Sequence, residues 1–242
     1  MKVICEMIRY QYKQYMMSAK WVMPFIVLLG LLGIMYNMAP VGIVDSFSIT
    51  GIFLFVIMVW IGRTIQGVEP EVSEHVMILR LKSDRKYYLC HIMFIMCICA
   101  AVTGISIVVP VFIHIRSGNA LLSRQLIWPD FVGGGLLMFA CSFTGGMAGE
   151  LFHIRIMKNR NVGIGLTFLI ALLAVCRNGV IADFAIMKYI LWIIPPISDV
   201  VSWFTNESYF NMGEVMRGFI ILLIYGIVMA VMKVELLRRV KF

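Results

Sequence analysis

The chain has 242 residues, 61% of them hydrophobic and 14% charged, whereas an average globular chain has roughly 45–50% and about 25%. A soluble core cannot hide this much apolar surface, and a mean hydropathy of +0.92 leaves lipid as the solvent that tolerates it. The composition argues against a disordered chain, a nucleic-acid binder and a disulfide scaffold, and it indicates an all-α integral membrane protein. The net charge is +8. In a membrane protein the positions of lysine and arginine indicate which loops lie in the cytoplasm, so we interpret this charge by its position along the chain.

The first 20 residues have the pattern of an amphipathic helix that lies flat in the headgroup layer. One face carries the charged residues Lys2, Glu6, Arg9, Lys13 and Lys20. The opposite face carries Ile4, Ile8, Tyr12, Tyr15 and Ala19. Two interpretations remain open: a lever at the cytoplasmic surface, or a passive anchor that completes the first span.

Gaps between charged residues predict where the chain crosses the membrane, because a charge at the bilayer centre costs about 2.5–3.5 kcal/mol. The gaps predict one six-span domain over residues 21–242, with spans near residues 21–38, 46–62, 87–113, 131–152, 161–177 and 216–233. The last gap is short for a hydrocarbon core of about 30 Å, but Arg217 and Lys233 at its ends can snorkel to the headgroups.

The loop over residues 63–86 is predicted to hold a short helix at the cytoplasmic surface. Glu69, Glu71 and Glu74 suit the positive end of a helix, and an apolar run from Val76 to Leu81 follows them. An amphipathic helix displayed there is typical of a surface that a cytosolic partner grips. The alternative is an interfacial helix that touches only lipid.

The fourth predicted span is rich in glycine, which allows close approach to a neighbouring helix. Gly145 and Gly149 near its end are the candidate packing positions, either within the bundle or across a dimer. Glu150 and His153 follow as a single Glu-x-x-His, which we interpret as a polar end of the span at the cytoplasmic headgroups.

Residues 178–214 are predicted to form a re-entrant or interfacial hairpin on the outer side. Its apolar stretch contains Asp183 and Lys188 and ends in Pro195 and Pro196, which stop a helix. A full crossing here would put the basic C-terminus outside, against the positive-inside bias. The alternative is a long fifth helix kinked at Asn178-Gly179.

With six spans and both termini inside, the cytoplasmic segments hold 16 of the 21 lysines and arginines. The outside keeps Arg116, Arg124, Arg177, Lys188 and Arg217. The charge pattern therefore predicts a multi-pass protein with both termini in the cytoplasm.

No enzyme motif is present: the chain has no HExxH, no GxSxG and no phosphate-binding loop. No catalytic residue, metal site or bound cofactor is predicted, and energy from ATP would have to come from another subunit. His91, His114 and His153 lie near span ends and not in facing pairs, which predicts interfacial hydrogen bonding and not haem ligation.

The loop over residues 63–86 and the start of the next span contain Glu74, Leu79, Leu81, Ser83, Arg85, Tyr87 and Tyr88 in this order. In these positions the chain resembles the loop pattern of the permease subunits of type 2 ATP-binding-cassette exporters. The Gly-Thr and the proline often found in the pattern are missing. The order of features is similar as well: an interfacial helix, two spans, an acidic loop, then four spans with an outer hairpin before the last.

The resemblance implies a permease that works in the bacterial cytoplasmic membrane with a second copy or a homologous partner. Two cytosolic ATPase subunits would carry the ATP and Mg²⁺. The coupling helix would contact them through Glu74, His75, Met77, Ile78, Leu79 and Arg80. The outer hairpin, with Asp183, Lys188, Pro195 and Pro196, would lie near the exit of the pathway.

The small size resembles exporters of amphipathic peptides such as phenol-soluble modulins, and bacteriocin-immunity permeases. The 19 methionines and 16 phenylalanines can form a soft lining for such cargo. The alternatives are bacteriocin or lantibiotic immunity, efflux of lipids or drugs, a passive anchor that sequesters a toxin without ATP, and a membrane-embedded enzyme. An enzyme would need polar residues that converge at mid-depth.

Overall fold

A computed structural model describes residues 2–37, 40–68, 71–81, 83–118, 121–153, 157, 159–184, 186–205 and 207–239. Within these ranges all regular structure is helical, apart from one isolated β-bridge between Val41 and Leu122. The all-α prediction is thereby confirmed for this part of the chain. The helices are α1 Lys2–Met17, α2 Val22–Met35, α3 Ile43–Ile65, α4 Glu71–Leu81, α5 Asp84–Arg116, α6 Trp128–Leu151, α7 Arg160–Asp183, α8 Met187–Ile190, a 3₁₀ turn η1 Leu191–Ile193, α9 Ile197–Ser202 and α10 Met212–Arg239.

In the described ranges, five helices are long and apolar enough to cross a membrane: α3, α5, α6, α7 and α10. The first predicted span corresponds to α2, whose 14 residues extend about 21 Å and fall short of a hydrocarbon core of about 30 Å. It reaches the length of a span only together with Cys5–Met17 of α1, from which it is bent by 79°. The helices are therefore those of a multi-pass membrane protein with five or six spans.

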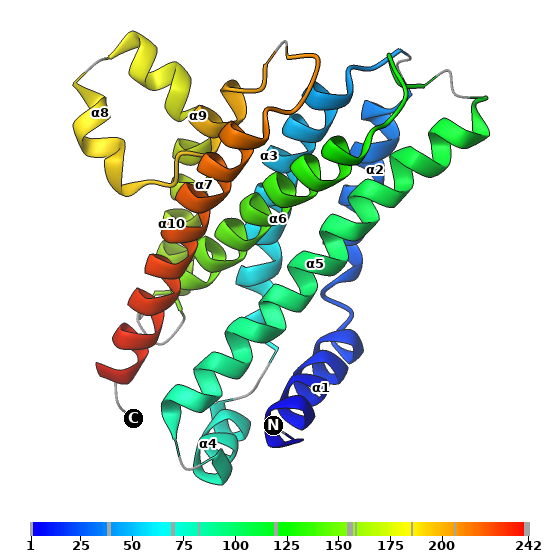
Figure 1. The fold of residues 1–242 in the computed structure, drawn as a ribbon. Coiled ribbons are helices and arrows are strands. Elements are labelled where there is room, and N and C mark those ends of the chain that lie inside the picture. The colour runs from blue at the N-terminus through cyan, green and yellow to red at the C-terminus, as the bar shows by residue number, and fades with distance from the viewer. Residues whose placement is uncertain are drawn as a thin grey trace.

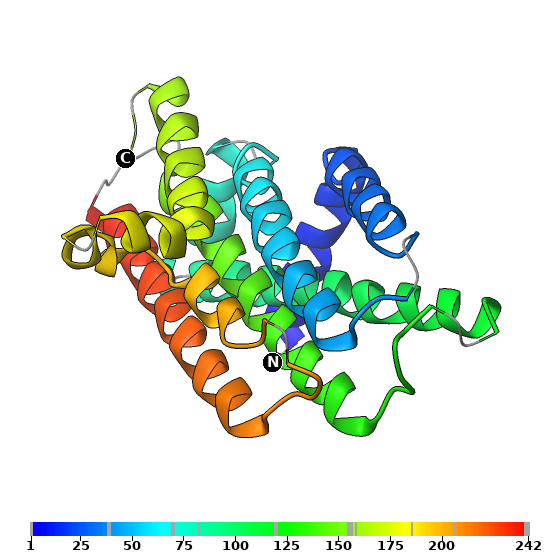
Figure 2. The ribbon, with the colours of Figure 1, turned by 90° about the horizontal axis from the view of Figure 1, so that it is seen from above.

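The two ends of the bundle differ in what they carry (Figure 1). One end, called the terminal end below, holds α1, α4, the end of α6, the start of α7 and the last turns of α10. The opposite end holds the end of α2, the start of α3, the end of α5 and the starts of α6 and α10. In the view from above, α6 lies inside the bundle, where it packs against α3, α5, α7 and α10 (Figure 2).

Glycines bring α6 and α3 into close contact. A Cβ atom at Gly145 would collide with the backbone of Phe55, and one at Gly149 with the backbone of Val59. The two predicted packing positions therefore act inside a single bundle, where small residues let two helix backbones approach.

The chain after α7 differs from the predicted hairpin. Helix α7 continues through Asn178 and Gly179 to Asp183, beyond the predicted end at residue 177. Beyond Asp183 the chain forms three short elements. Helix α8 and the turn η1 lie at the side of the bundle (Figure 2), whereas α9 packs against α7 and α3 with Ile197 and Val200 buried. Helix α9 begins after Pro195 and Pro196, since the proline ring removes a backbone donor that a continuing helix would need.

Helix α1 is amphipathic, but its buried face is rotated from the predicted one. Met7, Gln11 and Tyr15 are buried, whereas Tyr12, predicted for the apolar face, is 53% exposed. The reason is that α1 packs against α5, where Tyr15 meets the ring of Phe94 edge-on. Contact with the bundle, and not only with lipid, therefore selects the face.

Candidate functional site

One face of helix α4 packs against the terminal end of the bundle. Met77, Ile78 and Leu81 are partly buried and pack on a small apolar cluster, the terminal cluster, whose buried members are Met7, Tyr87, Tyr88, Cys90 and Leu237. These members come from α1, α5 and α10. Helix α4 thus contacts the start of the longest helix and the end of the last one.

The opposite face of α4 is open. Val76 is 56% exposed and Leu79 is 76% exposed, although both are large apolar side chains. Glu74, Ile78 and Leu81 follow helical spacing and share the face toward the bundle. Of the residues expected to contact an ATPase, Leu79 is on the open face. The side chains of His75 and Arg80 lie outside the described residues.

Glu74 is buried, although the resemblance implies that it contacts an ATPase. The residue is only 7% exposed. It lines a cavity of about 30 Å³ together with Gln66, His91, His153 and Lys233. In this structure its side chain therefore faces polar groups behind α4, and its contact with an ATPase stays a prediction.

Glu150 was predicted as a polar end of the fourth span at the headgroups, but it is buried inside the bundle. Its side chain is 0% exposed, one of its carboxylate oxygens lies 2.6 Å from Nε2 of His91, and the other accepts from the ammonium of Lys233. Lys233 is itself only 3% exposed. One residue each from α5, α6 and α10 thus forms a buried cluster, here called the Glu150 cluster.

His91 also links the Glu150 cluster to α1. The side-chain amide nitrogen of Gln11 in α1 lies 3.3 Å from Nδ1 of His91, on the ring edge away from Glu150. The buried carboxylate of Glu150 thus has two nitrogen partners, His91 and Lys233, and polar contacts join four helices, α1, α5, α6 and α10.

The carbonyl groups that end α6 are satisfied by side chains of α3. Arg63 donates to the carbonyl of Phe152 at 2.6 Å and to Oε1 of Gln66 at 2.6 Å. Gln66 in turn donates to the carbonyl of Gly149 at 3.0 Å. These bonds serve carbonyl groups that have no partner within their own helix, and they close the terminal end over the Glu150 cluster.

The space beside the Glu150 cluster bears on the alternative of a membrane-embedded enzyme. Its volume of about 30 Å³ is enough for a water molecule and too small for a substrate. The cluster lies toward the terminal end of α6 and α10.

At the opposite end, the predicted hairpin residues fall into two groups. Asp183 and Lys188 are exposed, and Pro195 and Pro196 are buried. The buried part is held to α7, where Arg177 lies 3.2 Å from Asp199 and the backbone N–H of Asn178 donates to Oγ of Ser198 at 3.1 Å. The exposed part carries large apolar side chains: Phe184, Ile186, Tyr189, Ile190, Trp192 and Ile193. Trp and Tyr beside a lysine are typical of a membrane interface.

A second ion pair at the opposite end was not predicted from the sequence. Arg124 donates to both carboxylate oxygens of Asp130, at 2.6 and 2.7 Å, and to the carbonyl of Ser208. Asp130 also accepts from the backbone N–H of Ile127, which caps the start of α6. The hydrogen bonds to Asp130 raise the pKa of the Arg124 guanidinium above its ordinary value. The available signal was an acidic residue directly before the fourth predicted span.

His114 does not make the interfacial contact that its position predicted. It is buried, and its Nδ1 accepts a hydrogen bond of 3.3 Å from the backbone N–H of Leu122. The histidine therefore joins the end of α5 to the connection that comes after it.

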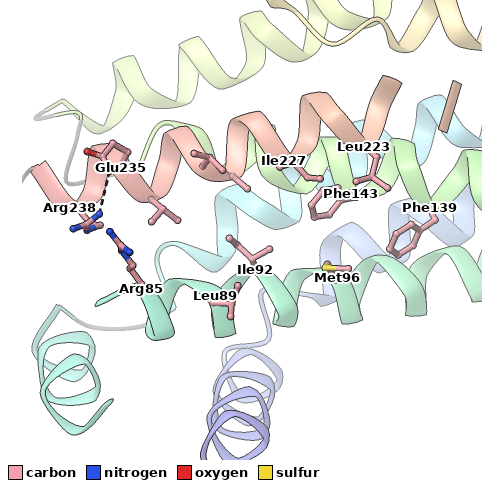
Figure 3. A pocket seen from close by; sticks show the side chains of 13 residues that line it. Arg85, Leu89, Ile92, Met96, Phe139, Phe143, Leu223, Ile227, Glu235 and Arg238 are labelled. Carbon is pink, nitrogen blue, oxygen red and sulfur yellow. Dashed lines mark hydrogen bonds and ion pairs between the residues drawn. The ribbon is translucent and has the colours of Figure 1, made fainter. Parts of the chain in front are cut away.

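Two apolar grooves run along the outside of the bundle. The larger, of about 630 Å³, lies between α2, α3 and α7. The smaller, of about 530 Å³, lies between α5, α6 and α10 (Figure 3).

Comparison of the chain with family models, with curated proteins and with solved structures finds no match.

Proposed function

We propose that the chain is the permease subunit of an ATP-driven exporter of the type 2 ATP-binding-cassette class. The observation that supports this proposal is the two-sided character of α4. One face is fastened to α5 and α10 through the terminal cluster, and the other presents Val76 and Leu79 to the outside. In this proposal the exposed apolar face is the docking site of the ATPase, whereas in the alternative it contacts only lipid.

The same geometry gives a route by which a force on α4 can reach the spans. Two residues separate α4 from α5, a helix of 33 residues. The Glu150 cluster then joins α5 to α6 and α10 by buried polar contacts. A push on α4 would therefore move three spans together, and packed helices of this kind shift between discrete arrangements.

Cargo transport requires a surface that one bundle alone does not enclose. The larger groove is open on the outside of the bundle, and its walls include Val27, Leu31, Phe53, Trp60 and Phe168. We assign it to the apolar face of an amphipathic peptide, with a second permease copy or a homologous partner closing it. Bacteriocin immunity and efflux of lipids or drugs would use the same surface with different cargo.

The coupling proposal is tested by Leu79→Asp. The chain is co-expressed with candidate ATP-binding-cassette ATPase subunits and purified, and both the bound ATPase and the ATP hydrolysis stimulated by an amphipathic peptide are measured. Because the aspartate places a charge on the open face of α4, we expect loss of the ATPase from the complex while the permease remains inserted.

The matched control is Ile186→Asp, which changes an equally exposed apolar residue at the opposite end, 80% exposed against 76% for Leu79. It should leave the complex intact. A Leu79→Asp variant that retains the ATPase and full activity would show that α4 is not the contact.

The orientation is tested separately by cysteine labelling in a background that lacks the exposed Cys5, Cys97 and Cys176. With the terminal end in the cytoplasm, Lys188→Cys reacts with an impermeant maleimide added to intact cells. Leu79→Cys then reacts only after the membrane is opened. The reverse pattern would place α4 outside and exclude a cytosolic ATPase as its partner.

A further inference from the structure

The smaller groove has a polar mouth at the terminal end and apolar walls that lead away from it (Figure 3). Arg85 at the start of α5 and Arg238 near the end of α10 lie at the mouth, together with Glu235. Farther along, Met96 and Ile227 form the two walls, and Phe143 of α6 lies between them. The groove thus changes from charged to apolar along its length.

The mouth carries an excess of positive charge. Among the described lining residues Glu235 is the one carboxylate, and two arginines share it, Arg238 at 3.5 Å and Arg239 at 3.3 Å. Among the described residues no carboxylate lies within ion-pair distance of Arg85. An anion placed between Arg85 and Arg238 would therefore supply the charge that the chain itself does not.

The length of the groove matches one leaflet of a bilayer. From Arg85 to Met96 the helix advances eleven residues, about 16 Å, and half of a hydrocarbon core of about 30 Å is about 15 Å. The walls are open to the side, since Leu89, Met96 and Ile227 are 53%, 41% and 48% exposed. An acyl chain can enter such a groove sideways from the membrane.

We propose that this groove binds an anionic phospholipid of the leaflet at the terminal end. The phosphate lies between Arg85 and Arg238, because the planar guanidinium group matches the geometry of phosphate oxygens. One acyl chain follows the groove past Ile227 toward Phe143. The flexible Met96 adapts to the chain.

A second copy of this chain is a less suitable occupant. A symmetric dimer formed through this face would use the same patch on both copies. It would bring the arginines of one mouth close to a mouth of the same sign, which opposes association. A lipid with a negative headgroup does not have this cost. The proposal does not depend on the ATPase contact, so either can fail alone.

The test is native mass spectrometry of the purified chain in detergent, titrated with phosphatidylglycerol or with phosphatidylcholine of the same acyl chains. We expect preferential retention of phosphatidylglycerol. Arg85→Gln and Arg238→Gln should each reduce that preference roughly fivefold, the value expected for one basic residue near an anionic headgroup. Glu235→Gln should change it in the opposite direction, because it removes the negative charge from the mouth.

Matched controls separate the groove from general effects on the protein. Ile227→Trp fills the groove and should weaken binding of both lipids. Ile224→Trp, on the same helix and 54% exposed but outside the lining, should not. Arg217→Gln, 67% exposed at the opposite end of α10, controls for loss of a surface charge.

Three results would overturn the proposal. Equal retention of both lipids by the unchanged chain would exclude a headgroup preference. An unaltered preference in the Arg85→Gln and Arg238→Gln variants would place the anion elsewhere. A dimer that Ile227→Trp dissociates would assign the groove to a second copy.

Discussion

The two ends of the bundle are both held by ion pairs, but the pairs join different parts of the chain. At the terminal end, Glu150 and Lys233 belong to two membrane-spanning helices, and their side chains are 0% and 3% exposed. At the opposite end, Asp130 is buried, but its partner Arg124 lies in a connection and is 20% exposed. Charge therefore fixes spans to each other at one end and a connection to a span at the other.

The largest loss of stability is expected from breaking the pair of Glu150 and Lys233 at the terminal end. Lys233→Met leaves Glu150 without its cation inside the bundle, and loss of one partner from a buried pair costs about 3–5 kcal/mol. We expect a marked fall in the thermal unfolding temperature in detergent. Arg239→Met, 77% exposed on the same helix, should have little effect.

The double variant Glu150→Gln with Lys233→Met decides whether the pair acts as a unit. Removing both charges leaves no isolated ion, so the double variant should unfold at a higher temperature than Lys233→Met alone. Additive losses would show that the two side chains do not depend on each other.

The second largest loss of stability is expected from filling the space beside a glycine, and glycine packing also differs between the two ends. At the terminal end, a Cβ at Gly149 meets the backbone of Val59; at the opposite end, a Cβ at Gly133 meets the ring of Phe210. A ring can rotate away and a helix backbone cannot. Gly149→Ala should therefore cost about 1–3 kcal/mol, and Gly133→Ala less.

Gly165→Ala in α7 is the control for the Gly149→Ala and Gly133→Ala substitutions, because nothing lies within 4 Å of a Cβ atom at Gly165. It should leave the unfolding temperature unchanged or raise it slightly, since alanine is a better helix former than glycine. Equal losses at all three positions would mean that packing of α6 on α3 is not what Gly149 provides.

The helices themselves could be predicted from the sequence, because the bilayer core excludes charge and a long gap between charged residues is therefore typical of a spanning helix. Helix α4 could be predicted from acidic residues followed by an apolar run, and the packing role of Gly145 and Gly149 from their small size and spacing. The short α2 and the continuation of α7 to Asp183 could not. A charge near a span end is compatible with the headgroup layer, so Asp183 does not by itself mark where a helix stops.

The burial of Glu74 and Glu150 could not be read from the sequence, because it depends on which helices are neighbours. The predicted topology does place Glu150, His91 and Lys233 at the same end of three spans. It does not say that those spans are adjacent, and a charged residue at a span end ordinarily reaches the headgroups. Only the contacts of α6 with α5 and α10 turn three separate residues into one cluster.

The smallest loss of stability is expected at the opposite end, from Asp130→Asn. The asparagine keeps an oxygen that can accept from the N–H of Ile127, so the start of α6 stays capped, and what is lost is the charge that faces Arg124. With the arginine partly exposed, the loss should be about 1 kcal/mol. Near 1 M salt, where the screening length is about 3 Å, the difference between Asp130→Asn and the unchanged chain should shrink. The difference made by Lys233→Met should persist, because salt screens a buried pair much less. If salt reduced both differences alike, the Glu150 cluster would be as open to solvent as the Arg124 pair, and the contrast between the two ends would be lost.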